Sequence, residues 1–556
     1  MINSDEIPQP DAPKQGASRW DDTWPATRLE THFGERVVRC FVQRPHSVYA
    51  MLEQAAQRYP QRDALVCGDE RLHWQDVLDR TAALAAGLAQ RGVGVGDRVA
   101  MLIGNRNEFV ITLFAIIRLG AIAVPLSTRE QTPGLAYMLN DCGAMLIVHD
   151  ADVGDRLPVG ADVPLLRSRV SVGVFAGSES ISSVATDAGS APPVIVSEDD
   201  TVAIMYTSGT TGNPKGAILT HLGVVHSAMH FESAMGLTAF DVSIAAVPLS
   251  HVTGLVAMVA TMVRSAARLV IMPSFRAADF LVLAVRERMT HTLMVPAMYN
   301  LCLLQSDFDQ HDLSCWRVGA YGGAPMPVPS ITRLADKVPG LTLMNCYGST
   351  ETTSPSTLMP QGETAAHNDT VGRSLACVEM AVFDDAGHEV EPDTLGEIWI
   401  KGPMVVKGYW NNLTATADNF TGGFWHSGDI GSIDAAGYVK VVDRKKDMIN
   451  RGGYKIYTIE VENVLYAHPA VIECAVVAKP CPVLGERVHA FVTLREGDVA
   501  IDALTAYCKA RLSDYKVPES FTISASPLPR NANGKLLKRA LRDQASVLLP
   551  VEKVRA

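Results

Sequence analysis

Eleven consecutive residues near the middle of the chain have the composition of a phosphate-binding loop. Residues 206–216 are YTSGTTGNPKG, with three glycines, four small hydroxyl residues and one lysine. The glycines permit unusual φ values, so that many backbone N–H groups can turn inward on an anion. No Gly-Lys-Ser/Thr follows Gly209 at the Walker spacing, which disfavours a P-loop kinase or GTPase. The plain alternative is a Ser/Thr/Gly-rich surface turn.

Six further short motifs follow this loop in order along the chain. They are YGGAP at 321–325, YGSTE at 347–351, WHSGD at 425–429, DRKKD at 443–447, RGGYK at 451–455 and PRNANGK at 529–535. Together with the first loop they closely resemble the adenylate-forming superfamily of acyl-CoA synthetases, peptide-synthetase adenylation domains and firefly-type luciferases. The resemblance extends from about Val48 to Arg542. It identifies the class of reaction far better than the substrate.

These residues need a large scaffold, and the composition provides one. A chain of 556 residues, 47% hydrophobic and 20% charged, is typical of a globular protein with at least two domains. Its net charge of -11 disfavours non-specific nucleic-acid binding, since it repels the phosphate backbone.

Cysteine usage and apolar runs indicate the compartment. The ten cysteines show no C-x-x-C spacing and no cluster with histidine, so reduced thiols in a cytoplasmic protein are expected. The polar N-terminus lacks the apolar run of a secretory signal. The most membrane-like run, residues 109–126, is interrupted by Arg118 and ended by Pro125, which favours a buried helix leading into a strand over a transmembrane segment. The oligomeric state stays open, a homodimer included.

Short apolar strands alternate with helical patterns in the first two thirds of the chain. Strands are expected near 64–66, 96–104, 144–149, 242–249, 268–272 and 342–346. This alternation predicts layered α/β structure with mostly parallel sheets. The Ser/Ala/Gly-rich residues 176–191 are expected to form a surface loop.

From Gly372 the pattern changes to short alternating strands, which predicts a β-rich subdomain. Beyond Asp447 a helix, two strands and a terminal helix predict a small α+β C-terminal domain, and the resemblance implies that this domain is mobile. The fold class is therefore α/β, with a large N-terminal AMP-binding (adenylation) domain over residues 1–442, a hinge at 443–447 and a C-terminal domain over 448–556.

The resemblance implies a two-step reaction. A carboxylate attacks the α-phosphorus of ATP to give an acyl-adenylate and pyrophosphate, and the thiol of coenzyme A then displaces AMP. Because the first step joins two anions, it requires cations and Mg²⁺. Lys535 matches the principal catalytic lysine, whose ammonium bridges the substrate carboxylate and the α-phosphate. Alone, a Gly-Lys pair near a C-terminus is usually a solvated surface lysine.

The same resemblance implies the nucleotide and metal site. Glu351 is expected to hold Mg²⁺, Thr350 to contact the α-phosphate and Tyr347 to stack on adenine. Asp429 is expected to accept hydrogen bonds from the ribose hydroxyls, with Arg444 approaching the ribose or phosphate from the other side. The remaining nucleotide-binding candidates are Thr207, Ser208, Gly209, Thr210, Thr211, Gly212, Lys215, Gly322, Gly323, Ala324 and Gly348.

The second step implies a rotation of the small domain, because the catalytic lysine would obstruct the thiol. Lys446 matches the family's hinge position, and Gly452 and Gly453 match the wall of the CoA tunnel. A tight hairpin without a ligand is the alternative for this loop. The chain departs from a common form of the family at Tyr454, where Glu is frequent, and at Thr458, where Pro is frequent.

The acyl pocket is expected between residues 248–254 and 346–355. His251 matches a position at the carboxylate end of the pocket, and its other wall candidates are Val252, Cys346, Gly348 and Thr353. These small, mostly apolar residues favour an aryl or medium-chain acid. The predicted function is an ATP- and Mg²⁺-dependent acid–CoA ligase. The alternatives are transfer to a carrier-protein phosphopantetheine in trans, to oxygen as in a luciferase, or a catalytically silent nucleotide-binding relative.

Overall fold

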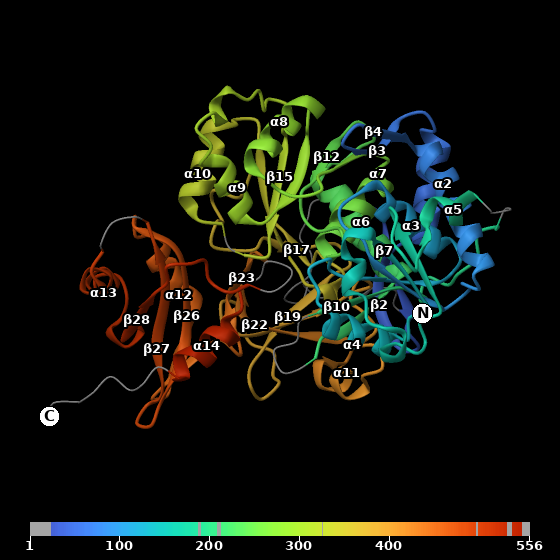
Figure 1. Ribbon diagram of the computed structural model, residues 1–556. Coiled ribbons are helices and arrows are strands. Elements are labelled where there is room, and N and C mark those ends of the chain that lie inside the picture. The colour runs from blue at the N-terminus through green and yellow to red at the C-terminus, as the bar shows by residue number, and fades with distance from the viewer. Residues whose placement is uncertain are drawn as a thin grey trace, which may run out of the picture.

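The computed structural model describes residues 24–186, 191–207, 213–324, 326–495, 499–530 and 536–547. Figure 1 shows the large N-terminal part from blue to orange and the C-terminal unit in red beside it. No helix among these residues is long and apolar enough to cross a membrane.

Two large sheets build the N-terminal part, and both are mostly parallel. The seven-stranded sheet has the order β11 (Lys215–Thr220), β10 (Thr201–Thr207), β6 (Ile122–Pro125), β5 (Arg98–Leu102), β7 (Leu146–Asp150), β8 (Ser168–Val172) and β9 (Glu179–Ser180). The nine-stranded sheet has the order β18 (Arg373–Ser374), β17 (Thr357–Leu358), β16 (Thr342–Tyr347), β15 (Val318–Gly322), β14 (His291–Met294), β12 (Val242–Ala245), β13 (Arg268–Ile271), β3 (Asp63–Cys67) and β4 (Glu70–His73). The strands expected from the sequence are present.

Helices cover both sheets and form one continuous main core between them. Its helices are α1 (Val48–Arg58), α2 (Trp74–Gln90), α3 (Asn107–Arg118), α6 (His221–Met235), the π-helix η3 (Thr253–Ala260) and α7 (Thr261–Ser265). Ten of the twelve residues of α3 are buried, as expected for a helix that is apolar on every side, and β6 follows it. A second core lies under α8 (Ala277–Glu287), α9 (Pro296–Leu303) and α10 (Val328–Lys337), and a third under α4 (Thr132–Cys142).

The prediction of a surface loop at residues 176–191 is wrong for residues 179–186. Strand β9 and helix α5 (Ile181–Thr186) lie there, after an exposed turn at residues 176–177. Val184 is fully buried, and its carbonyl lies so close to α2 that a Cβ at Gly87 would be 1.9 Å from it. The missing side chain of Gly87 thus admits α5, a tertiary contact that composition does not reveal.

A five-stranded antiparallel sheet follows as the predicted β-rich subdomain. Its strands are β19 (Glu379–Phe383), β20 (Gly396–Lys401), β22 (Phe424–Ile433), β21 (Phe420–Thr421) and β23 (Val439–Arg444), with α11 (Leu413–Asn419) beside them.

The C-terminal unit has its own sheet and its own core. Its strands are β25 (Tyr454–Ile456), β24 (Ile449–Arg451), β27 (Gly485–Leu494), β26 (Val471–Cys481) and β28 (Ser520–Ile523), and its helices are α12 (Thr458–Tyr466), α13 (Ile501–Lys509) and α14 (Lys538–Val547). The apolar clusters of this unit are separate from the main core. The predicted fold class is confirmed.

Candidate functional site

The carboxyl end of β16 meets the β22–β23 hairpin, and three predicted site residues come together there. The Tyr347 hydroxyl donates a hydrogen bond to Asp429 Oδ2 at 2.6 Å, and Arg444 Nε lies 2.6 Å from Asp429 Oδ1. Asp429 and Arg444 are register partners on the two strands of the hairpin. Strand pairing therefore fixes the ion pair, although fifteen residues separate its members in the sequence.

The Asp429 side chain is buried, and its neighbours are polar. Asp429 is 4% exposed, and its backbone N–H donates to Ser427 Oγ at 3.0 Å. Burial and the Asp429 carboxylate raise the pKa of the Tyr347 phenol well above its ordinary value, so the phenol stays a donor. Since a carboxylate offers about four lone-pair positions, Asp429 keeps capacity to accept further hydroxyl donors.

Glu351 lies on the short 3-10 helix η5 (Thr350–Thr352), directly after Tyr347-Gly-Ser. Its Oε1 accepts a hydrogen bond from the Tyr409 hydroxyl at 3.1 Å, and the ammonium of Lys215 lies 5.0 Å from the centre of the same ring. Tyr409 thus links the phosphate-loop lysine with the predicted metal ligand. Tyr409 could not be anticipated from the sequence, because it belongs to none of the ordered motifs.

The phosphate-binding loop connects two antiparallel strands. Thr207 ends β10 and pairs with Lys215, the first residue of β11, and the Thr207 hydroxyl donates to the Lys215 carbonyl at 3.4 Å. Gly216 O accepts the N–H of Trp410 at 2.7 Å, which joins the loop base to the Tyr409 segment. The other loop candidates lie outside the described residues: Ser208, Gly209, Thr210, Thr211 and Gly212.

The local backbone structure explains why glycine occupies three of the predicted nucleotide-site positions. A Cβ at Gly322 would lie 2.4 Å from Cys346 O on the neighbouring strand, and Gly323 has a φ of +78°. A Cβ at Gly348 would lie 3.2 Å from Thr352 Oγ1. These glycines bring β15, β16 and η5 close together, and exposed Ala324 follows them.

The predicted acyl-pocket histidine stands in a firmly held turn. His251 Nδ1 lies 3.3 Å from the backbone nitrogen of Thr253 and 3.2 Å from Thr253 Oγ1, so the ring is held by the turn that follows it. Asn105 fixes the preceding segment, because its Nδ2 donates to Val247 O at 2.9 Å and its Oδ1 accepts the Leu249 N–H at 2.9 Å. The sequence analysis did not single out Asn105.

Of the remaining wall candidates, Val252, Cys346 and Thr353 are buried, whereas Gly348 is exposed. Val252 precedes η3, and Cys346 lies on β16, where burial raises the pKa of its thiol. The Thr353 hydroxyl donates to Met404 O at 2.6 Å, so that this backbone contact accounts for its polar atom without a ligand. The acyl-pocket assignments stay predictions.

The predicted CoA loop is a two-residue hairpin turn between β24 and β25. Arg451 pairs with Tyr454, and the two residues between them, Gly452 and Gly453, have φ of +59° and +91°. Such turns favour glycine at both positions. The turn geometry therefore explains both glycines, and a role in CoA binding stays a prediction.

The predicted hinge is a tight turn after β23. The N–H groups of Asp447 and Met448 both donate to Arg444 O, at 2.9 and 3.1 Å. Burial and nearby Arg444 lower the pKa of Lys446. Lys535 lies outside the described residues, but the base of its loop is visible, because Arg530 pairs with Leu536 and the Leu537 N–H donates to Pro529 O at 2.8 Å.

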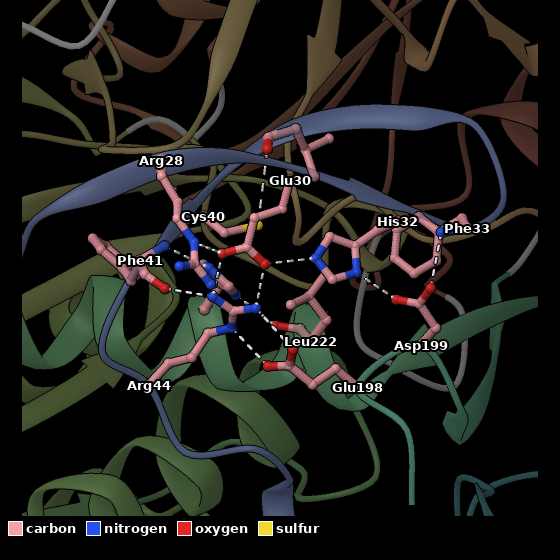
Figure 2. Close-up of polar contacts among 12 residues, drawn as sticks. Arg28, Glu30, His32, Phe33, Cys40, Phe41, Arg44, Glu198, Asp199 and Leu222 are labelled. Carbon is pink, nitrogen blue, oxygen red and sulfur yellow. Dashed lines mark hydrogen bonds and ion pairs between the residues drawn. The ribbon is translucent and has the colours of Figure 1, made fainter.

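Among the described residues, one group has the ligand types of a metal site, and Figure 2 shows it. Ligand atoms of Glu30, His32 and Cys40 lie within 4.8 Å of one another. Arg44, however, donates to both Glu30 oxygens, at 3.0 and 2.7 Å, and it holds the pKa of Glu30 well below its ordinary value.

The protonation of Cys40 and one further contact of Arg44 give this group a structural explanation. Burial raises the pKa of Cys40 to about 12, so the thiol keeps its proton, and Arg44 Nε also lies 2.6 Å from Glu198. We interpret the group as an ion network that fastens the hairpin of β1 (Thr27–His32) and β2 (Arg36–Phe41) to the segment before β10.

Comparison with known proteins places this geometry in a family. The family model described as AMP-binding enzyme matches residues 52–410, and the model described as AMP-binding enzyme C-terminal domain matches residues 460–535. The chain belongs to the AMP-binding enzyme family. The predicted superfamily is thereby confirmed.

Relatives in this AMP-binding family are named as CoA ligases. The chain is 34% identical over 507 residues to the long-chain-fatty-acid–CoA ligase FadD13 of Mycobacterium tuberculosis, covering 90% of this chain and 99% of that protein. It is 34% identical over 488 residues to a feruloyl-CoA synthase of Amycolatopsis sp, covering 88% and 96%. The predicted reaction class is that of these relatives.

Solved structures of one relative contain the ligands of the first step. The o-succinylbenzoate CoA synthetase of Bacillus subtilis in complex with its acyl-adenylate intermediate matches with a TM-score of 0.80 and 31% identity, over 92% of this chain and 99% of that chain. The same enzyme in complex with ATP and magnesium ion matches with a TM-score of 0.79 and 31% identity, over 89% and 98%.

Proposed function

We propose that this protein is an ATP- and Mg²⁺-dependent ligase that joins a carboxylic acid to coenzyme A through an acyl-adenylate. The observation that carries the proposal is the buried Asp429 carboxylate, held between the Tyr347 hydroxyl and Arg444 at the end of β16. A fixed, charged acceptor beside an aromatic ring suits a nucleoside, whose ribose offers two hydroxyl donors and whose base offers a flat face. The acid is proposed to be aryl or medium-chain.

In the first step a carboxylate oxygen of the acid bonds to the α-phosphorus of ATP, and the bond to pyrophosphate breaks. Lys215, the phosphate-loop amides and Lys535 are assigned to neutralise the charges that approach each other. His251 is assigned to the acyl carboxylate, because an imidazole N–H can donate to an anionic acceptor. In the second step the CoA thiol gives its proton to solvent, its sulfur bonds to the acyl carbon, and the bond from that carbon to the AMP oxygen breaks with its electron pair going to AMP.

The described residues fit a magnesium ion at Glu351. Its carboxylate accepts one hydrogen bond from Tyr409, which orients it and leaves further lone pairs for a hard cation. When bound, the ion would neutralise phosphate charge. Tyr409 also keeps Lys215 and Glu351 on one side of the site, through its ring and its hydroxyl respectively.

The decisive experiment separates the two half-reactions. Lys535→Ala is expected to reduce acid-dependent exchange between pyrophosphate and ATP by about 100-fold or more, the usual size of a lost charge-stabilising group. Transfer from a supplied acyl-adenylate to CoA should stay within about threefold, since Lys535 is assigned to the first step only. Lys509→Ala, an exposed lysine of the same unit, is the matched control.

Normal exchange in Lys535→Ala would remove that lysine from its role. A panel of aryl and aliphatic acids, assayed with CoA for AMP release, would identify the substrate class. If none of the acids supports AMP release by the wild-type protein, the proposed function itself is contradicted.

A further inference from the structure

The end of β23 is joined to the C-terminal unit by a buried contact. Asp443 and Thr458 are both buried, Asp443 on β23 and Thr458 as the first residue of α12. The Thr458 N–H donates to Asp443 Oδ2, and the Thr458 hydroxyl donates to Asp443 Oδ1 at 3.1 Å. The N-cap residue of α12, Tyr457, makes no side-chain cap. The Asp443 carboxylate thus satisfies the start of a helix in the other unit, where a negative charge is favourable.

This contact extends to the helix that follows the Lys535 loop. Lys538 Nζ lies 2.7 Å from Thr458 Oγ1 and 2.7 Å from Glu462 Oε1. One turn further along α14, Arg542 Nη2 lies 2.7 Å from Asp447 Oδ1. Lys538 and Arg542 therefore hold one face of α14 along the junction, beginning three residues after Lys535.

The position of the contact relative to the hinge decides what it can do. With Lys446 as the hinge, Asp443 moves with the β-rich subdomain, whereas Thr458, Lys538, Asp447 and Arg542 move together with the C-terminal unit. A rotation about Lys446 must then break the Asp443–Thr458 contact and can leave the contacts of Lys538 and Arg542 intact. Another contact across the junction, Lys455–Asp385 at 3.4 Å, joins two exposed side chains and contributes less.

We infer that Asp443 and Thr458 form a latch that stabilises the domain arrangement seen here against the rotated one. The inference rests on the proposed function and makes both residues positioning residues for the two half-reactions. It also gives the departure at Thr458 a physical meaning, because a proline there has neither the N–H nor the hydroxyl that Asp443 accepts. The latch therefore depends on having threonine rather than proline at position 458.

The test uses substitutions at Thr458 in the full-length protein. Proline is well tolerated at the first position of a helix, so Thr458→Pro removes both donors with little cost to α12. Thr458→Val removes only the hydroxyl, and Thr458→Ser keeps both donors. The measurements are pyrophosphate–ATP exchange, transfer from a supplied acyl-adenylate to CoA, and the rate of tryptic cleavage at Lys445 and Lys446.

Thr458→Pro is expected to change the ratio of the two half-reaction rates by about tenfold, the scale of hydrogen bonds to a buried charge, and Thr458→Val by less. Thr458→Ser should keep the wild-type ratio, and cleavage in the junction should speed up in Thr458→Pro by about fivefold. An equal change of both half-reactions, or no change, would overturn the latch. If the wild-type protein catalyses neither half-reaction, the proposed function fails, and unchanged cleavage in Thr458→Pro would then overturn the latch independently.

Discussion

At the scale of single residues, the site depends on side chains whose polar atoms are each held by a defined partner. Asp429 is buried between a phenol and a guanidinium, and Glu351 is oriented by Tyr409. Such partners fix rotamers before a ligand arrives, which lowers the entropic cost of binding. The residue-scale expectation is therefore that these carboxylates act through charge and position together.

Asp429→Asn is the prediction that tests this expectation. An amide keeps one acceptor oxygen but loses the negative charge, so Arg444 loses its ion-pair partner and the ribose loses an acceptor. The KM for ATP in the exchange reaction should rise about tenfold or more, the scale of hydrogen bonds to a charged group. Tyr347→Phe keeps the aromatic ring and leaves the Asp429 carboxylate in place, so it should raise the KM for ATP less. An unchanged KM in Asp429→Asn would disprove the ribose assignment.

At the scale of elements, the β24–β25 hairpin shows how one pair of residues can have two explanations. Its turn needs positive φ at Gly452 and Gly453, and this requirement exists with or without CoA. A bulky residue at Gly453 would disturb the turn as well as any tunnel. A test of the CoA assignment therefore needs a control substitution at another glycine with a similar positive φ.

We predict that Gly453→Asn slows transfer to CoA by about tenfold and leaves pyrophosphate–ATP exchange within about twofold. Asparagine tolerates positive φ better than most residues, and open space surrounds a Cβ at Gly453. Gly437→Asn is the matched control, because Gly437 has a φ of +85° and equally open surroundings in another turn. Equal losses of both half-reactions, or the same loss in the control, would refute the assignment.

At the scale of the whole molecule, buried neutral histidines tie stability to pH. Burial lowers the pKa of His226 to about 3 and of His221, His230 and His291 to about 4, from an ordinary value of 6.5. His226 Nε2 accepts the Phe41 N–H at 3.1 Å, so its neutral form joins α6 to β2. As the pH falls below 6.5 the unfolded chain binds these protons first, and this part of the stability is lost.

The whole-molecule prediction is a pH-dependent cost of His226→Gln. The variant should be less stable than the wild type at pH 7.5, and the difference in unfolding free energy should shrink as pH falls below 6.5. The change should approach ~1.4 kcal/mol per pH unit, measured by urea unfolding. His388→Gln, at an exposed position, controls for the substitution. A difference that stays constant with pH, or that grows as the pH falls, would contradict the prediction.

The sequence alone determined the family, the reaction class and the order of the elements. Motif order and apolar periodicity are local properties, so a helix such as α3 and a turn such as Gly452-Gly453 can be anticipated from neighbouring residues. Through the family resemblance, the ordered motifs also predicted that Tyr347, Asp429 and Arg444 belong to one site. A Ser/Ala/Gly-rich composition misled at α5, because the contact of Val184 with Gly87 is made nearly a hundred residues away along the chain.

Only the tertiary structure decided which partners these residues have. The contacts of Tyr409 and Asn105 and the Asp443–Thr458 contact follow no local pattern, because each joins two separate segments of the fold. Hydrogen bonds depend on distances of about 3 Å, and sequence spacing does not specify such distances between separate elements. The sequence therefore determined the chemistry this protein is built for, and packing decided how its charges are held.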